Sequence, residues 1–114
     1  MDEQERSDID SKWREQQEID KKNKADSGGV FHQPTFTIFL SSMSMQAMIA
    51  LGRLANPVTK TTDRNLEQAR FLIDTLAIVK DKTKGNLSEA EQSLIEESLY
   101  NLRIMYLEEN KKEV

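Results

Sequence analysis

The residues best placed for binding chemistry lie in one short stretch of the chain. They are Lys82, Lys84, Gly85, Asn86 and Ser88. Lysines beside the free N–H groups and the positive dipole end of a helix can bind an anion such as a nucleotide phosphate. The same residues also suit a plain connection between two helices, because Gly85 supplies a left-handed residue and Ser88 supplies an N-cap. The capping interpretation is favoured, since a glycine-rich phosphate loop is missing.

Other side chains with catalytic chemistry are few. The sequence contains no Cys and a single His, His32, which excludes a thiolate nucleophile, a Cys-containing metal site and a two-His metal motif. Four carboxylates on helix-like segments could in principle work as acid–base pairs: Glu67, Asp74, Glu91 and Glu96. Bundle surfaces are commonly this acidic, however, and no Glu-x-x-His motif accompanies them. We therefore expect no catalytic residue, no metal, no cofactor and no enzyme activity.

Net charge and apolar segments indicate which partners and which location to expect. Sixteen Lys and Arg face twenty Asp and Glu, which gives a net charge of −4. This balance lacks the broad positive field that nucleic-acid binding uses, so a nucleic-acid partner is not expected. The acidic first residues lack an apolar signal segment, which favours a cytoplasmic protein. The most apolar stretch, Phe36 to Leu51, is too short and too rich in Ser to span a membrane.

Composition divides the chain near residue 35. Residues 1–34 hold 15 charged and only 7 apolar residues, which is too little apolar surface to offset the entropy of ordering. We predict a disordered or conditionally helical tail over 1–34, a helical domain over 35–107 and a frayed end over 108–114. Ser27-Gly28-Gly29 is the expected link, with His32 exposed beside it.

Apolar spacing and capping residues predict an all-α domain, a small bundle of three helices. The expected helices run from about Thr35 to Leu54, from Asn65 to Lys84 and from Ser88 to Leu107. Asn65 and Ser88 are the expected N-caps. Only a few residues separate the second and third helices, so these two should form an antiparallel hairpin. The path between the first and second helices does not follow from the sequence.

Each of the three helices has one main apolar face, at a rotation of roughly 100° per residue. The predicted core comprises Phe36, Leu40, Met43, Ala47, Ala50, Leu51, Leu54, Leu66, Ala69, Leu72, Ile73, Leu76, Ala77, Leu94, Ile95, Leu99, Leu102, Met105 and Tyr106. Further apolar residues fall on the opposite faces: Ile38, Met45, Ile49, Phe71, Ile78, Tyr100, Ile104 and Leu107. A monomer of this size would expose more apolar surface than is usual.

These second faces predict self-association or a permanent protein partner. A two-fold homodimer is the simplest arrangement, because one self-complementary patch then covers both copies. The alternative is a monomer whose helices deviate from ideal geometry and bury both faces. We thus expect a non-enzymatic interaction or assembly protein that associates through these faces. The alternative function is an anion or nucleotide-phosphate binding module at the Lys82–Ser88 turn.

Several runs of residues resemble a known family. They are Leu51-Gly52 with Asn56-Pro57, Asn65-Leu66-Glu67-Gln68-Ala69-Arg70 with Ile73-Asp74, Lys82-Thr83-Lys84-Gly85-Asn86-Leu87, and Leu99-Tyr100-Asn101-Leu102-Arg103 with Tyr106. Over about residues 36–106 the chain is similar to the bacterial family named domain of unknown function 1844. The resemblance implies a small, helical, cytoplasmic bacterial protein with no established activity, cofactor or substrate, so it assigns no functional residue.

Overall fold

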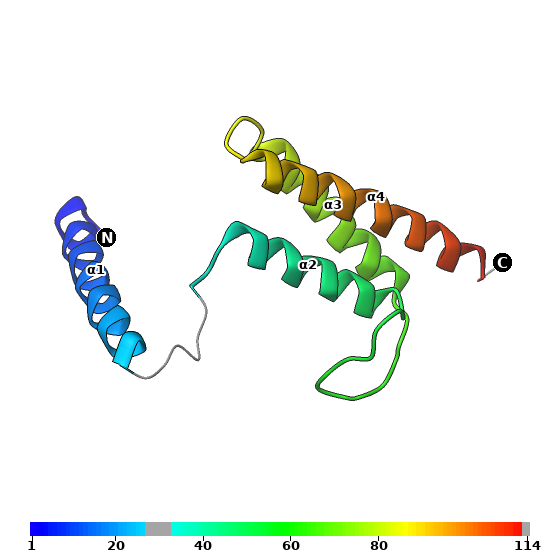
Figure 1. The fold of residues 1–114 in the computed structure, drawn as a ribbon, viewed down its shortest axis with the longest axis horizontal. Helices are drawn as coiled ribbons and strands as arrows, with labels where there is room; N and C mark the ends of the chain where they lie inside the picture. Colours follow the sequence, from blue (N-terminus) through cyan, green and yellow to red (C-terminus); the bar gives the residue numbers. More distant parts are fainter. Residues whose placement is uncertain (27–32, 113–114) are drawn as a thin grey trace. The chain divides into compact units, whose positions relative to one another are not determined.

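The computed structural model describes residues 1–26 and 33–112, with the side chains of 23–26 excepted. Over these residues the chain forms four α-helices and no strand (Figure 1). The helices are α1 (Glu3–Asp26), α2 (Phe36–Ala50), α3 (Leu66–Lys82) and α4 (Glu89–Lys111). The all-α class is therefore confirmed, whereas the predicted count of three helices is wrong by one. None of the helices in the described part combines the length and apolarity that crossing a bilayer requires.

The additional helix is α1, in the first of two compact units, Met1–Gln33 and Pro34–Val114. The sequence predicted a disordered or conditionally helical tail here, and the structure has a helix. Its described side chains are all exposed, so only local interactions support it: the Asp2 carboxylate accepts from Glu5 N, and Gln4 donates to Asp8. Residues with high helix propensity dominate its sequence. The predicted link at Ser27-Gly28-Gly29 and the exposed His32 lie outside the described residues.

Helices α2, α3 and α4 form a bundle in which each helix packs against the other two. α3 and α4 run side by side in opposite directions and are joined by a short turn, as predicted (Figure 1). Side chains cap all three helices at their beginnings: Thr35 accepts from Ile38 N, Asn65 accepts from Gln68 N, and Ser88 accepts from Glu91 N. The predicted caps at Asn65 and Ser88 are confirmed.

Helix α2 ends earlier than predicted, and helix α4 ends later. α2 ends at Ala50 instead of Leu54, because Gly52 adopts φ +78 and closes a Schellman motif. In this motif Arg53 N donates to Met48 O at 2.9 Å and Gly52 N donates to Ile49 O at 3.0 Å. α4 continues to Lys111, past Leu107, its predicted end.

The core lies where the three helices meet. Its buried members are Leu40, Ala47, Ala50, Leu51, Ala69, Leu72, Ile73, Leu76, Ile95, Leu99 and Leu102. The other predicted core residues on α3 and α4, together with Phe36 and Met43, are partly buried against this cluster. Leu54 is the exception, since it follows the end of α2 and is exposed. The helical periodicity therefore identified the core correctly within each helix.

The connection from α2 to α3 is an ordered loop that extends away from the bundle (Figure 1). The Asn56 side chain accepts from Val58 N at 2.8 Å, and the Asn56 backbone pairs with Lys60 and Thr61. Lys60 adopts φ 59, and Val58 is almost fully exposed. The loop is thus held by its own short-range hydrogen bonds.

Candidate functional site

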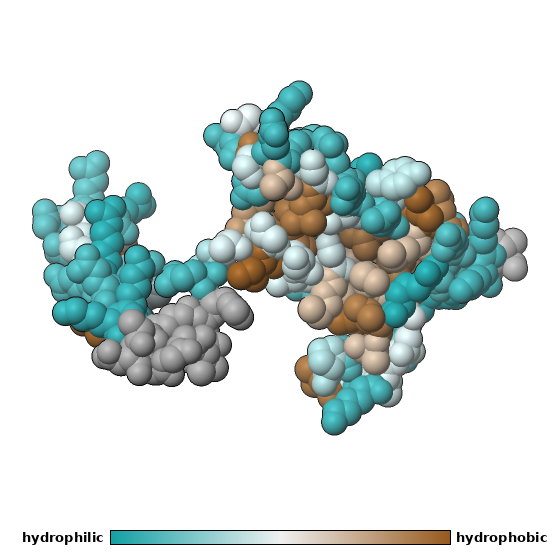
Figure 2. Space-filling view, viewed as in Figure 1, coloured by the Kyte–Doolittle hydropathy of each residue, from teal (hydrophilic) through white to brown (hydrophobic). Residues whose placement is uncertain are grey.

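The eight residues of the predicted second faces lie on three helices and do not form one compact site. Seven of them are exposed: Ile38, Met45, Phe71, Ile78, Tyr100, Ile104 and Leu107. Ile49 is half-buried. Figure 2 shows apolar residues in brown on the visible side of the bundle, interrupted by hydrophilic ones. Packing of the three helices leaves these faces uncovered, so the monomer does not bury both faces of its helices.

Helix α2 differs from its neighbours because none of its 15 residues is charged. Its outward side exposes Ile38, Phe39 and Met45 together with serines and Gln46. A helix that is apolar or neutral on all sides is typically covered on all sides in a folded protein. α2 is covered on one side only, which makes its outward face the strongest candidate contact surface.

A shallow groove of about 230 Å³ lies between α3 and α4. α3 contributes Arg70, Ile73 and Asp74, and α4 contributes Arg103, Tyr106 and Leu107. The Arg70 and Asp74 side chains form an exposed i,i+4 ion pair with a Nε–Oδ2 distance of 3.8 Å. Such an exposed pair contributes little to stability. The groove has an apolar floor between charged rims.

The Lys82–Ser88 turn is built from helix caps. Gly85 adopts φ +87, Ser88 N donates to the Glu91 carboxylate at 2.8 Å, and Glu91 N donates to Ser88 Oγ at 3.2 Å. This reciprocal capping box occupies two groups at the N-terminus of α4. The Glu91 carboxylate already supplies negative charge at the position where an anion would bind. The capping role of Ser88 is confirmed, whereas α3 is capped by Thr83 and Gly85 lies two residues beyond that cap. Anion binding with Lys82 and Lys84 stays a prediction.

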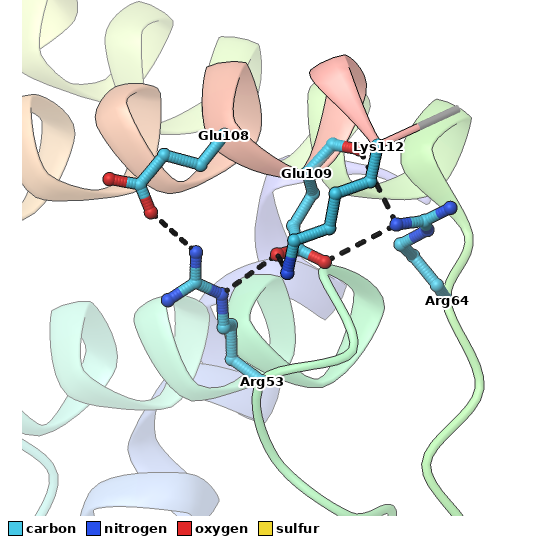
Figure 3. A network of polar contacts seen from close by, with 5 residues as sticks. All are labelled: Arg53, Arg64, Glu108, Glu109 and Lys112. Atoms are coloured by element: carbon cyan, nitrogen blue, oxygen red, sulfur yellow. Dashed lines mark hydrogen bonds and ion pairs between the residues drawn. The ribbon is translucent and has the colours of Figure 1, made fainter. Parts of the chain in front are cut away.

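The cluster of polar contacts at the end of α4 was not foreseen (Figure 3). Glu109 is buried, with 6% of its surface exposed, and its carboxylate contacts three cations. Arg53 Nε lies at 3.2 Å, Arg64 NH1 at 3.3 Å and Lys112 Nζ at 2.9 Å. Glu108 adds an ion pair of 2.6 Å with the Arg53 guanidinium. Arg53 follows α2 and Arg64 precedes α3, so one carboxylate fixes both ends of the connecting loop.

The charged side chains of this cluster shift the pKa values of Glu109 and Arg53. The hydrogen bond from Lys112, followed by that from Arg64, lowers the pKa of Glu109, although its partial burial acts in the opposite direction. The pKa of Arg53 is raised, chiefly by its hydrogen bond to Glu108. Carboxylates in the last turn of a helix face the negative end of its dipole and are unfavourable there without cations. Glu108-Glu109 in that position was therefore the sequence signal for this cluster.

Among residues 1–26 and 33–112, no group of three or more metal-ligating side chains lies close enough together to hold an ion. Three of the four carboxylates considered for acid–base chemistry make local contacts, and the fourth, Glu67, lies in the first turn of α3. Glu91 belongs to the capping box, Asp74 pairs with Arg70, and Glu96 accepts from Gln92 at 2.8 Å.

Comparison with known proteins assigns the chain to a family. The model of a family described as a domain of unknown function, DUF1844, matches residues 33–108. The chain belongs to the DUF1844 family. The resemblance noted over residues 36–106 is thereby confirmed. Comparisons with curated proteins and with solved structures give no match.

The DUF1844 match covers α2, α3 and most of α4. It therefore includes the neutral face of α2 and the α3–α4 groove. Arg53, Arg64 and Glu108 lie within the match, whereas Glu109 and Lys112 lie beyond its last residue. Helix α1 also lies outside the DUF1844 region.

The Glu109 cluster of this DUF1844 protein predicts a specific pH dependence of stability. The folded-state pKa of Glu109 is lowered, so the carboxylate stabilises the fold above its ordinary pKa, and this contribution is lost as the pH falls through the folded value. We expect Glu109→Gln to lower the urea midpoint at neutral pH. The difference from the wild-type chain should shrink progressively in acid.

The matched control for this prediction is Glu97→Gln on the same helix. Glu97 is exposed, and its replacement should leave the urea midpoint unchanged across the pH range. Denaturation curves for the wild-type chain and both variants, followed by circular dichroism, provide the test. Identical pH profiles for the two variants would contradict the stabilising role of Glu109.

Proposed function

We propose that this DUF1844 protein is a non-enzymatic helical interaction or assembly protein, and that it associates with a second copy of itself through exposed apolar helix faces. The observation that carries the proposal is the outward face of α2, which is exposed and free of charge. The non-enzymatic part rests on the side-chain chemistry of the sequence, which has no Cys and one His.

Exposed aromatic residues on the other helices support the same function. Phe71 is 70% exposed and Tyr100 is 67% exposed. Large aromatic side chains dominate interface energetics. A bundle with so small a core also has limited stability by itself. Covering exposed apolar surface in a homodimer would add stability to each copy.

The test is the molar mass of the full chain in solution, measured by light scattering coupled to size-exclusion chromatography. We expect a mass of twice 13.1 kDa at high protein concentration. The mass should decline toward the monomer on dilution, because a short helical interface dissociates readily. A mass of one chain from about 1 μM to about 1 mM would contradict self-association, since binding weaker than this is marginal.

A further inference from the structure

We propose that the outward face of α2 pairs with α2 of a second copy, antiparallel and about a two-fold axis. The contact consists of Ile38, Ser42, Met45 and Ile49, named here the α2 seam. This inference rests on the proposed self-association and specifies which surface carries it. Three observations on α2 support it: the spacing of the seam residues, their exposure, and the absence of charge.

The spacing of the α2 seam is that of a helix-pairing stripe. Successive members are four, three and four residues apart, which is the alternation that places one residue per turn along a straight line of contact between two helices. Ile38 is 43% exposed and Met45 is 51% exposed. The buried residues Leu40 and Ala47 belong to the opposite side of the helix. The seam is thus a second packing face, exposed at Ile38, Ser42 and Met45 and half-buried at Ile49.

The same spacing is symmetric about its own midpoint, between Met43 and Ser44. An antiparallel two-fold pair therefore places Ile38 opposite the partner's Ile49, and Ser42 opposite the partner's Met45. Two branched side chains meet at each end, and a small residue meets a long flexible one on either side of the centre. Alternation of large and small residues lets two helices pack at the usual 3-4 ridge-and-groove crossing.

The absence of charged residues around the α2 seam favours a second copy of this chain over a charged partner. The residues flanking the seam are Phe39 and Gln46 on one side and Ser41 and Met48 on the other, all neutral. Charged flanking residues are what direct a helix toward a partner of opposite charge and prevent pairing with itself. Without them, two copies of α2 approach with no repulsion, and no acidic or basic partner gains from binding.

Charge also distinguishes the α2 seam from the other exposed apolar residues. On α3, Phe71 is adjacent to Arg70, and Glu67, Asp74 and Asp81 are exposed on the same helix. On α4, Tyr100 and Leu107 share the exposed side with Arg103. Pairing either of these surfaces with a copy of itself would bring ionised groups close together and remove water from them, which is costly. α2 is therefore the face that a second copy covers best.

The first experiment exploits the absence of Cys from the natural sequence. Full-length Ile38→Cys and Ile49→Cys variants are oxidised separately and as an equimolar mixture, and cross-linked dimer is measured on a non-reducing gel. In the antiparallel pair the two positions face each other. Position 38 of one copy lies about 16 Å along the helix from position 38 of the other, which is beyond the reach of a disulfide.

We expect at least a fivefold excess of cross-linked dimer in the mixture over either variant alone. Equal cross-linking of Ile38→Cys with itself would overturn the antiparallel arrangement. Absence of cross-linking in every sample of a chain that light scattering shows to be dimeric would overturn pairing through α2. In that last case the proposed self-association itself still stands.

The second experiment introduces one charge at the centre of the seam. Met45→Asp in the full chain should convert the dimer to a monomer at concentrations where the wild-type chain is dimeric, with unchanged helical circular dichroism. Tyr100→Asp, at a more exposed position on α4, is the matched control and should stay dimeric. A dimer that survives Met45→Asp but not Tyr100→Asp would place the interface on α4. A wild-type chain that is monomeric throughout overturns both proposals.

Discussion

Leu76→Ala is expected to destabilise the bundle by about 2–5 kcal/mol, the range measured when a fully buried leucine is shortened in a packed core. Leu76 has no exposed surface and lies in the middle of α3, among core residues of all three helices. Truncation removes apolar contact and leaves a cavity that helices fixed by their caps cannot fully close. Because bundles of this size hold only ~3–5 kcal/mol of stability, the variant should be largely unfolded at 37 °C.

Thermal and urea denaturation followed by circular dichroism measure this effect. The control is Gln68→Ala, which shortens an exposed side chain of comparable length on the same helix and should change the unfolding free energy by less than about 0.5 kcal/mol. A Leu76→Ala chain as stable as Gln68→Ala would mean that the three helices do not pack around Leu76 as described.

Two glycines with the same backbone conformation should respond differently to alanine. Gly52 has φ +78 and Gly85 has φ +87, and the left-handed conformation alone costs an L-residue about 1–2 kcal/mol. An added Cβ at Gly85 would have nothing within 4 Å, whereas one at Gly52 would lie 3.3 Å from Arg64 Cβ. Moving Arg64 would also disturb its contact with Glu109.

We therefore expect Gly52→Ala to cost roughly 2–5 kcal/mol, the sum of backbone strain and overpacking. Gly85→Ala should be destabilised only by the backbone strain, because its added Cβ meets no neighbouring atom. Urea denaturation of both variants gives the two free energies directly, and Glu109→Gln made in the Gly52→Ala background tests the coupling. If the two mutations add fully, Arg64 has not been displaced from Glu109.

Local sequence patterns predicted the individual helices of the bundle well. The N-caps at Asn65 and Ser88 depend on residues within a few positions of each other, as does the periodicity that identifies the buried side of each helix. Leu54 was assigned to the core because periodicity does not register where a helix ends. The Schellman motif at Gly52 ends α2 before it. For residues 1–34 the composition left disorder and conditional helix open, and residues of high helix propensity form α1 there without a core.

The Glu109 cluster could not be predicted because its members are distant in sequence. Arg53 and Glu109 are separated by 56 positions, and no local pattern records that the loop after α2 and the end of α4 meet. An acidic pair in the last turn of α4 was the available signal, and its meaning depends on cations supplied by other segments. Packing of the three helices brought them together, and α4 continues past Leu107, its predicted end.

The sequence by itself determined the helical class, the caps, the α3–α4 hairpin and the inward side of each helix, because these depend on contacts within one or two turns. Only the tertiary structure decided which surfaces stay open. It left the neutral side of α2 uncovered, and it closed the connecting loop onto a single buried carboxylate. The physical reason is that the burial of a side chain is set by the helices packed around it, and three helices around one core can each bury only one side.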